Sequence, residues 1–245
     1  LRYGYYLKNT LELYNNRKKL NELRKRTVRN KKDPLVSILI ATYNRPKCLT
    51  QRAIKSVLNQ TYQNFEIVVV GDHCSEETVR AVEKIDDERL IFHNLPERGK
   101  YPEDPVFRWM VAGVTPSNKA IDMASGEWIG PLDDDDKFSP DHIEVLLNHA
   151  LENDYEMVYG KVRNEEENGQ WSELGSFPLR EKEISRMAVL YHSNLSFMKY
   201  DIDSWKYYQP GDWNLWRRMN EAGVKIGFLD KVVGNHYQEM SQLGV

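Results

Sequence analysis

The sequence predicts an α/β fold of the doubly wound type, with a mostly parallel, Rossmann-like sheet and helices on both faces. Three observations predict it. Apolar, β-branched runs alternate with helix-patterned segments at least three times in about 120 residues. The runs lack polar alternation, which is typical of strands covered on both faces. Gly, Pro, Asn or Asp follows most of them. The length of 245 residues and the hydrophobic content of 40% suit one domain with an appendage.

The first predicted strand is residues 36–41, in which Ser37 is the only polar residue. Asn44-Arg45-Pro46 ends this strand and opens a helix. The buried stripe of that helix is expected to comprise Leu49, Ala53, Ile54, Val57 and Leu58.

The second predicted strand is residues 65–70, which ends at Gly71-Asp72, and the third is residues 90–92. The proline-broken stretch 93–116 gives no assignment. A short helix is then expected at residues 118–125.

A further strand is expected at residues 127–132, where Pro131 has to lie at a strand end or a bulge because it lacks an N–H. The chain becomes helical again from Asp141. Near its end, residues 225–229 are predicted as a strand, and residues 232–237 return toward the same edge of the sheet.

The charge is divided unevenly. Residues 1–32 carry 11 Lys and Arg against two Glu, a net of +9, whereas the remainder carries 23 basic and 35 acidic residues, a net of −12. We therefore expect a basic helical arm or linker at 1–33 and a domain at 34–245. Helical spacing in the arm is shown by Leu7, Leu11, Tyr14, Leu20 and Leu23. The arm either contacts an anionic membrane face or packs on its own domain or an upstream one. The acidic body makes a nucleic-acid partner the weaker hypothesis.

Composition excludes several classes of protein. The two cysteines, Cys48 and Cys74, are too few for a disulfide framework, which predicts a reducing, cytoplasmic location, peripheral at the inner membrane face if the arm binds there. No apolar run approaches the ~20 residues of a membrane-spanning helix. Neither a P-loop nor a Gly-x-Gly-x-x-Gly fingerprint nor a Gly-x-Ser-x-Gly elbow is present.

Polar residues cluster where the predicted strands end, which is where doubly wound sheets bind ligands. Thr42 and Arg45 follow the first strand, Asp72 the second, and four aspartates at 133–136 the fourth. Four adjacent carboxylates require a positive partner. A divalent metal with hard oxygen ligands, Mn²⁺ or Mg²⁺, fits this need. The alternative is an acidic surface turn ahead of the helix that follows Pro140.

Several motifs in order resemble the family 2 glycosyltransferases of the GT-A fold. The motifs span roughly residues 35 to 240 and include residues 36–45, 56–61, 65–72, 118–129 and 133–136, the last resembling the family's Asp-x-Asp region. The resemblance implies a nucleotide-binding half at 34–136, an acceptor-binding half at 137–245, and a nucleotide-sugar donor, most often a UDP-sugar.

The resemblance also implies roles for individual residues. Asp135 is expected to be the principal metal ligand, joined by His236, and Asp72 is expected to accept the N3 proton of uracil. The remaining nucleotide-binding positions that it implies are Ala41, Thr42, Tyr43, Arg45, Asp133 and Asp134.

In the second half, the resemblance makes Asp212 the candidate general base, which would deprotonate an acceptor hydroxyl. Capping of the following helix is the alternative role for this residue. His192 and Trp213 are candidates for contact with the acceptor or the diphosphate, although an aromatic residue in this region fits the core equally well.

The sequence departs from the family's pattern at two places. Only one acid, Asp72, follows the second strand, and Pro116-Ser117-Asn118 stands where many members have Ala-Arg-Asn. The missing arginine has three candidate replacements, namely Arg98, Lys100 and Arg108.

The leading hypothesis is an inverting, metal-dependent glycosyltransferase that acts on a saccharide or glycoconjugate acceptor in surface polysaccharide biosynthesis. A sugar nucleotidyltransferase uses a similar sheet and metal, but it needs a Gly-rich basic signature where this chain has Ala41-Thr42-Tyr43-Asn44. A catalytically silent sugar-nucleotide-binding domain is the third hypothesis. It is favoured if Asp212 points away from the aspartates.

Overall fold

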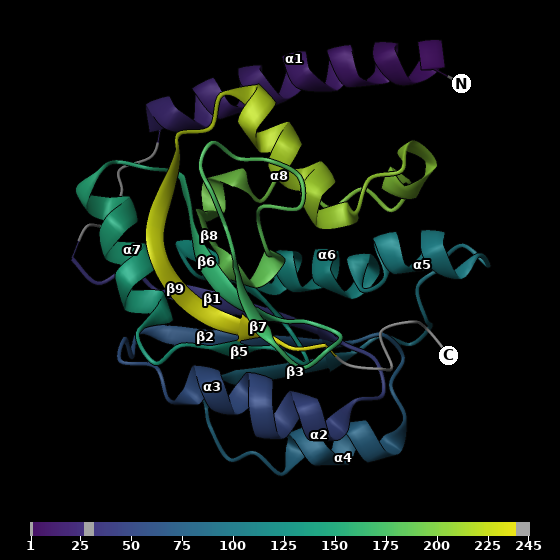
Figure 1. Cartoon of the computed structure of the whole chain (residues 1–245), viewed down its shortest axis with the longest axis vertical. Helices are drawn as coiled ribbons and strands as arrows, with labels where there is room; N and C mark the ends of the chain where they lie inside the picture. The colour runs from purple at the N-terminus through teal and green to yellow at the C-terminus, as the bar shows by residue number, and fades with distance from the viewer. Residues whose placement is uncertain (1, 27–31, 239–245) are drawn as a thin grey trace.

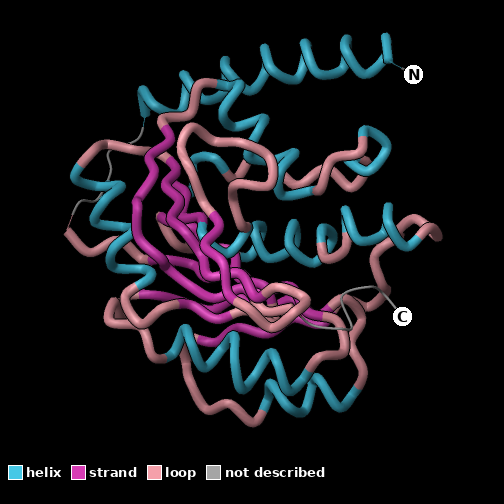
Figure 2. The backbone as a smooth tube through the Cα atoms, in the orientation of Figure 1, coloured by secondary structure: helices cyan, strands magenta, loops and turns pink. Residues whose placement is uncertain are grey.

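One continuous, curled sheet forms the centre of the molecule in this computed structural model, which describes residues 2–26 and 32–238 (Figure 2). The strand order is β3-β2-β1-β4-β8-β6-β9-β5, with β7 paired to β6. The strands are β1 Val36–Thr42, β2 Phe65–Gly71, β3 Leu90–Asn94, β4 Trp128–Asp133, β5 Lys137–Phe138, β6 Met157–Glu165, β7 Trp171–Leu174, β8 Val189–His192 and β9 Ile226–His236.

The first four strands of this order are all parallel, as the alternating sequence pattern predicts. Thr42 at the end of β1 lies opposite Gly71 of β2, and Ala41 lies opposite Asp133 of β4. The ends of these strands therefore meet at one edge of the sheet. Pro131 is tolerated because β4 pairs with β8 only at Trp128 and Ile129, so no β8 ladder bond is lost at Pro131.

Helices cover both faces of the sheet (Figure 1). They are α1 Arg2–Arg26, α2 Pro46–Cys48, the π-helical segment η1 Leu49–Ile54, α3 Lys55–Leu58, α4 Glu76–Glu83, α5 Pro105–Val111, α6 Val114–Met123, α7 His142–Glu152 and α8 Gly211–Ala222, with short 3₁₀ turns at η2 Arg186–Ala188, η3 Ser193–Leu195 and η4 Ser204–Tyr207. One face packs against residues 46–58, α4 and α7, and the other against α5, α6 and α8. Alternate residues of β1 supply the two cores, with Ile38 on the first face and Leu39 on the second.

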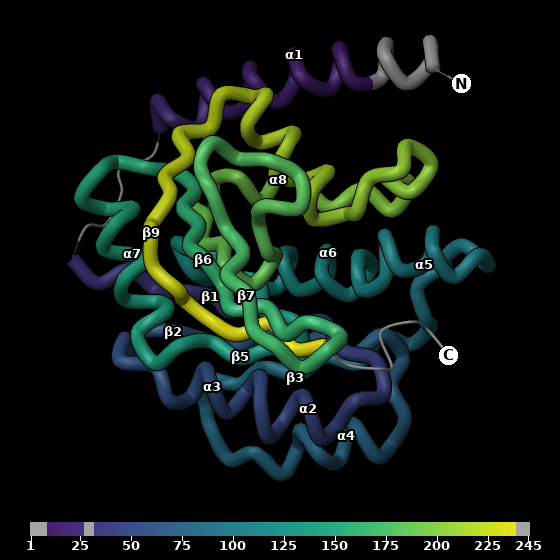
Figure 3. The backbone as a smooth tube through the Cα atoms, viewed as in Figure 1, coloured from purple at the N-terminus to yellow at the C-terminus, as the bar shows by residue number. Residues whose placement is uncertain are grey.

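The second half of the sheet is mixed. β8 runs antiparallel to both β4 and β6, β6 is parallel to β9, and β5 and β7 are antiparallel to their neighbours. The segments predicted at 225–229 and 232–237 are parts of one long strand, β9, which Figure 3 traces down the side of the sheet. Its last residue, His236, thereby reaches the edge where β4 ends.

The stretch that gave no sequence assignment contains the end of β3, the helix α5 and the first turn of α6. The α6 helix begins at Val114 rather than at Asn118, since Pro116 lies in the first turn, where its missing N–H costs nothing. Gly113 separates α5 from α6 with a φ of 74°, a left-handed conformation that favours glycine.

Helix α1 packs against α8 across the outside of the second core (Figure 1). Leu20 is fully buried there, and Arg17 donates to the carbonyl oxygen of Glu221 at 2.9 and 3.2 Å. Arg24 donates to both carboxylate oxygens of the buried Glu156, at 2.7 and 2.5 Å. None of the helices in the described ranges combines the length and apolarity needed to cross a membrane.

Candidate active site

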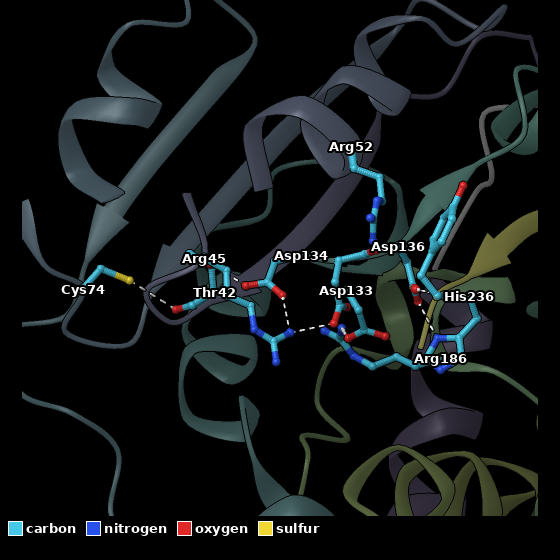
Figure 4. A network of polar contacts seen from close by, with 11 residues as sticks. Thr42, Arg45, Arg52, Cys74, Asp133, Asp134, Asp136, Arg186 and His236 are labelled. Atoms are coloured by element: carbon cyan, nitrogen blue, oxygen red, sulfur yellow. Dashed lines mark hydrogen bonds and ion pairs between the residues drawn. The ribbon is translucent and has the colours of Figure 1, made fainter. Parts of the chain in front are cut away.

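The carboxyl edge of β1, β2 and β4 brings together the polar residues that the sequence singled out (Figure 4). Thr42 ends β1, Arg45 precedes α2, and Asp133 ends β4. Asp72 follows β2 and is buried. A parallel arrangement of strands makes this convergence unavoidable, because each strand delivers its last residue to the same side.

The turn that comprises Asp133, Asp134, Asp135 and Asp136, here called the aspartate turn, is held by positive side chains on both sides (Figure 4). Asp134 accepts a hydrogen bond from Thr42 Oγ1 at 2.6 Å. Arg45 Nη1 lies 2.6 Å from Asp135 Oδ2 and 3.3 Å from Asp134 Oδ1. The inference that this turn needs positive charge is confirmed, and Arg45 supplies part of it.

The far end of the turn is joined to β9. Asp136, which is fully buried, accepts hydrogen bonds from His236 Nδ1 at 2.9 Å and from the Tyr237 backbone N–H at 3.0 Å. His236 therefore contacts Asp136, the residue next to Asp135, with which it was expected to share a metal. Burial alone would lower the pKa of His236, but the hydrogen bond to Asp136 and the charge of that carboxylate raise it to about 9.

Burial also perturbs the turn's own carboxyls. It raises the pKa of Asp134 to about 7, with a further increase from the charge of Asp135 and an opposing decrease from Arg45. Burial likewise raises the pKa of Asp136. Carboxyls with raised pKa values at the end of a strand are typical of functional sites rather than of solvated turns.

Arg186 is the residue that sequence analysis missed. It forms an ion pair with Asp133, donates from Nη2 to Ser117 Oγ at 3.1 Å and from Nε to the Tyr200 hydroxyl at 3.2 Å. Its side chain is only 12% exposed. Many family members have an arginine where this chain has Ser117, in α6. Here Arg186, from η2, donates a hydrogen bond to Ser117 and so brings a guanidinium to the same place.

Asp212 lies in the first turn of α8, and one of its carboxylate oxygens accepts a hydrogen bond from the Trp213 N–H at 2.7 Å. The pKa of Asp212 is raised by burial and by the charge of Asp133, while Arg186 opposes the increase. The candidate base of the second half is therefore within electrostatic reach of the aspartate turn. The N-cap residue of α8 is Pro210, so Asp212 does not occupy the capping position considered as its alternative role.

The loop after β3 contacts Asp72. The Gly99 N–H donates to Asp72 Oδ1 at 2.8 Å and the Tyr101 hydroxyl donates to Asp72 Oδ2 at 2.7 Å. The guanidinium of Arg98 lies 3.8 Å from the centre of the Tyr43 ring. Of the three cationic candidates, Arg98 faces this site, whereas Arg108 donates to backbone carbonyls of its own loop.

The structure places the two acceptor-side candidates as follows. His192 ends β8 and pairs with Trp128 at the start of β4, about 17 Å of extended chain from Asp133 at the end of that strand. Trp213 packs against the second core. Cys74 is buried and donates to the Thr42 carbonyl oxygen, and burial raises the pKa of its thiol, which makes it a poor nucleophile.

Within the described residues, no three His, Cys, Asp or Glu side chains form a ready-made metal cage. The donor set nevertheless fits Mn²⁺ or Mg²⁺, which bind one or two carboxylates and complete their shell with water and substrate phosphate. Asp133 is 37% exposed, whereas Asp135 is 4% exposed and paired with Arg45, so binding of a metal by Asp135 requires that ion pair to open.

The fold and the site define a GT-A glycosyltransferase domain. S. aureus TarS in complex with UDP-GlcNAc has the same fold, with a TM-score of 0.66 at 20% identity over 85% of this chain and 60% of that one. The mannosyltransferase PcManGT of Pyrobaculum calidifontis, in complex with GDP-Man and Mn²⁺, has a TM-score of 0.63 at 15% identity and covers 95% of this chain and 66% of its own.

Residues 33–244 match the family described as "Glycosyltransferase like family 2", and the chain belongs to this family. A colanic acid biosynthesis glycosyl transferase of Escherichia coli is 31% identical over 72% of this chain and 60% of its own length. A glucosyltransferase of Campylobacter jejuni that acts on GalNAc(5)-diNAcBac-PP-undecaprenol is 32% identical over 64% of this chain and 48% of its own length. The chain thus spans about half of the length of these relatives.

Proposed function

We propose that this chain is an inverting glycosyltransferase that moves a sugar from a nucleotide sugar to a hydroxyl of a saccharide or glycoconjugate. One observation carries the proposal: Asp212 of the second half lies close enough to Asp133 and Arg186 for their charges to shift its pKa, and Arg186 pairs with Asp133 at the carboxyl edge of the sheet. Family membership and the names of the relatives, which include polysaccharide biosynthesis enzymes, support it.

In the proposed reaction, Asp212 removes the proton from the acceptor hydroxyl while that oxygen attacks the anomeric carbon. The bond to the nucleoside diphosphate breaks on the opposite side, so the configuration inverts. The raised pKa of Asp212 suits a general base, because a more basic carboxylate takes up a proton more readily. The departing diphosphate carries away the electron pair, and Asp212 retains the proton.

A divalent metal, Mn²⁺ or Mg²⁺, would neutralise the charge that develops on the leaving diphosphate. Asp135 is proposed as its principal ligand, with His236 as a further one. Arg45 and Arg186 hold the carboxylates of Asp135 and Asp133 in place. Once these carboxylates bind the metal, the two arginines are available to contact the diphosphate.

The donor is proposed to be a UDP-sugar. Asp72 accepts the N3 proton of uracil, and the Gly99 N–H and Tyr101 hydroxyl orient its carboxylate, which keeps lone pairs for a further hydrogen bond. Tyr43, whose ring is covered by the guanidinium of Arg98, is proposed to lie beside the uracil. TarS was solved with UDP-GlcNAc, which supports this class of donor.

The test is to incubate the protein with Mn²⁺, an acceptor mixture and a panel of nucleotide sugars, and to measure release of the nucleoside diphosphate. Asp212→Asn should lower turnover by about 10²- to 10⁴-fold and leave nucleotide binding unchanged, because it deletes the proton acceptor and keeps the shape. Asp135→Ala should weaken the binding of metal and nucleotide together. Since only ionised Asp212 is active, kcat/KM should fall on the acid side at a pH above the ordinary aspartate pKa.

Full turnover in Asp212→Asn would show that another group is the base. Release of inorganic pyrophosphate from a sugar phosphate and a nucleoside triphosphate would instead identify a nucleotidyltransferase. Nucleotide binding with no turnover of any donor would identify a silent sugar-nucleotide-binding domain.

We also propose that the basic arm, residues 1–33, contacts an anionic membrane surface. One face of α1 packs against α8, and the opposite face exposes apolar and basic side chains together. Leu11 and Tyr14 are 63% and 65% exposed, and Lys18 and Lys25 lie on the same face. Each basic side chain near an anionic bilayer contributes about 1 kcal/mol.

The expected result is co-sedimentation with vesicles that contain phosphatidylserine and not with pure phosphatidylcholine. Lys18→Gln/Lys25→Gln should reduce this binding, whereas Lys84→Gln/Lys182→Gln, which removes two exposed charges elsewhere, should not. Equal binding by both variants would assign the arm to a linker or an upstream domain.

A further inference from the structure

A hollow lined by positive side chains lies behind the aspartate turn, between the helical segment 46–58 and strand β5. Its volume is about 690 Å³, within the range of small-molecule sites. We call it the basic pocket and define it by Lys47, Arg52, Lys55, Lys137 and Tyr237. None of the aspartates of the turn, nor Thr42, Asp72 or Asp212, lines it, so it is separate from the proposed donor site.

The pocket carries four cationic side chains and, among its described lining residues, no Asp or Glu. Lys47, Lys55 and Lys137 are exposed and form no ion pair with any residue in the described ranges. Isolated lysines are common on helix surfaces, but Lys137 comes from β5 and the other two from the helical segment. Their convergence on one hollow, in a body with a net charge of −12 beyond residue 32, marks a site for an anion.

Two of its residues hold the aspartate turn directly. Arg52 Nη1 donates to the Asp135 carbonyl oxygen at 2.5 Å, and its guanidinium lies 4.1 Å from the centre of the Tyr237 ring. The Tyr237 N–H donates to Asp136. Figure 4 shows that Arg52 and Arg186 approach the turn from opposite sides. The aspartate turn thus separates the basic pocket from the proposed donor site and is contacted by residues of both.

We propose that the basic pocket binds the phosphate group of a second ligand, distinct from the nucleotide sugar. Three flexible lysines and one arginine provide more charge than a single carboxylate needs, which favours a group with two or more negative charges. The volume leaves room for an organic body beside the phosphate, and the side chains of Gln51 and Asn59 in the lining offer it hydrogen bonds. The proposal concerns binding and does not depend on the transfer reaction.

The test measures the binding of inorganic pyrophosphate to the full chain by calorimetry, at constant ionic strength and with EDTA present so that no metal bridges the anion to the aspartates. Lys55→Gln/Lys137→Gln should weaken binding about tenfold or more, since each lost charge-assisted contact corresponds to roughly that factor. Lys84→Gln/Lys182→Gln, which removes two exposed lysines outside both the basic pocket and the arm, should bind as the unaltered chain does. Binding of UDP with Mn²⁺ should be unchanged in both variants, which shows that they are folded.

Two further probes distinguish the sources of the phosphate: glucose 1-phosphate in solution, and phosphatidylcholine vesicles that contain phosphatidic acid. Binding of either probe that is lost in Lys55→Gln/Lys137→Gln supports the proposal and identifies the source as a soluble ligand or a lipid headgroup. Equal affinity of this variant and the unaltered chain for pyrophosphate and both probes, or no binding at all, overturns it. Failure of the transfer assay with intact pyrophosphate binding would refute the proposed function alone.

Discussion

Arg45 and Arg186 supply positive charge that offsets the repulsion among the four consecutive aspartates. Each arginine comes from a segment far from the turn in sequence, and each contacts a different carboxylate. Sequence analysis predicted the need for positive charge and assigned it to a metal ion alone. It placed Arg45 at the correct edge, because Arg45 follows β1 directly. Arg186 gave no signal, since it stands in no motif and its partner Asp133 is 53 residues away.

Arg45→Ala should lower the free energy of unfolding by about 2 kcal/mol in the absence of metal, because it leaves buried carboxylates without their counter-charge. The loss should shrink as the pH falls below about 7, where protonated Asp134 no longer needs that charge. Urea unfolding at several pH values measures both effects.

The matched control for this measurement is Arg80→Ala. It removes an exposed pair with Glu76, in which the side chains are 72% and 79% exposed, so a change below about 0.5 kcal/mol is expected. Equal losses in the two variants would show that Arg45 is not a structural counter-charge.

At the scale of elements, most strands and helices of the first half were predictable from their own sequence, and α5 in the proline-broken stretch was the exception. β1, β2 and β4 lie where the apolar runs predict them, and α7 begins one residue after Asp141. Helix α1 shows the limit of such patterns. Its spacing predicted a helix, but its packed face is not the stripe of Leu11 and Tyr14. That face contains Leu20 with Arg17 and Arg24, whose hydrogen bonds to distant residues no periodicity of apolar residues can indicate.

Leu20→Ala should therefore lower the free energy of unfolding by about 3 kcal/mol, because it opens a cavity between α1 and α8. Leu11→Ala removes the same atoms from a side chain that is 63% exposed, and its effect should stay within about 0.5 kcal/mol. Chemical denaturation of both variants checks this, and an equal effect of the two would contradict the observed packing of α1.

At the scale of the whole molecule, the parallel half was predictable and the mixed half was not. β6, β7 and β8 were absent from the prediction, because β7 and β8 are only four residues long and the second half of β6 carries Lys161, Arg163 and Glu165. The long β9 carries His236 to the aspartate turn. Asp133 belongs to the first half of the chain and Arg186 to the second, so their ion pair joins the two halves.

The most direct test of this account is a crystal structure of the chain with UDP and Mn²⁺, with the metal located by its anomalous scattering. We predict a single Mn²⁺ peak between Asp135 and the diphosphate, with the uracil beside Asp72 and the Arg45 contact to Asp135 broken. Nucleotide bound elsewhere, or absent, with Arg45 and Arg186 still paired to the aspartates, would contradict the proposal that this edge is the donor site.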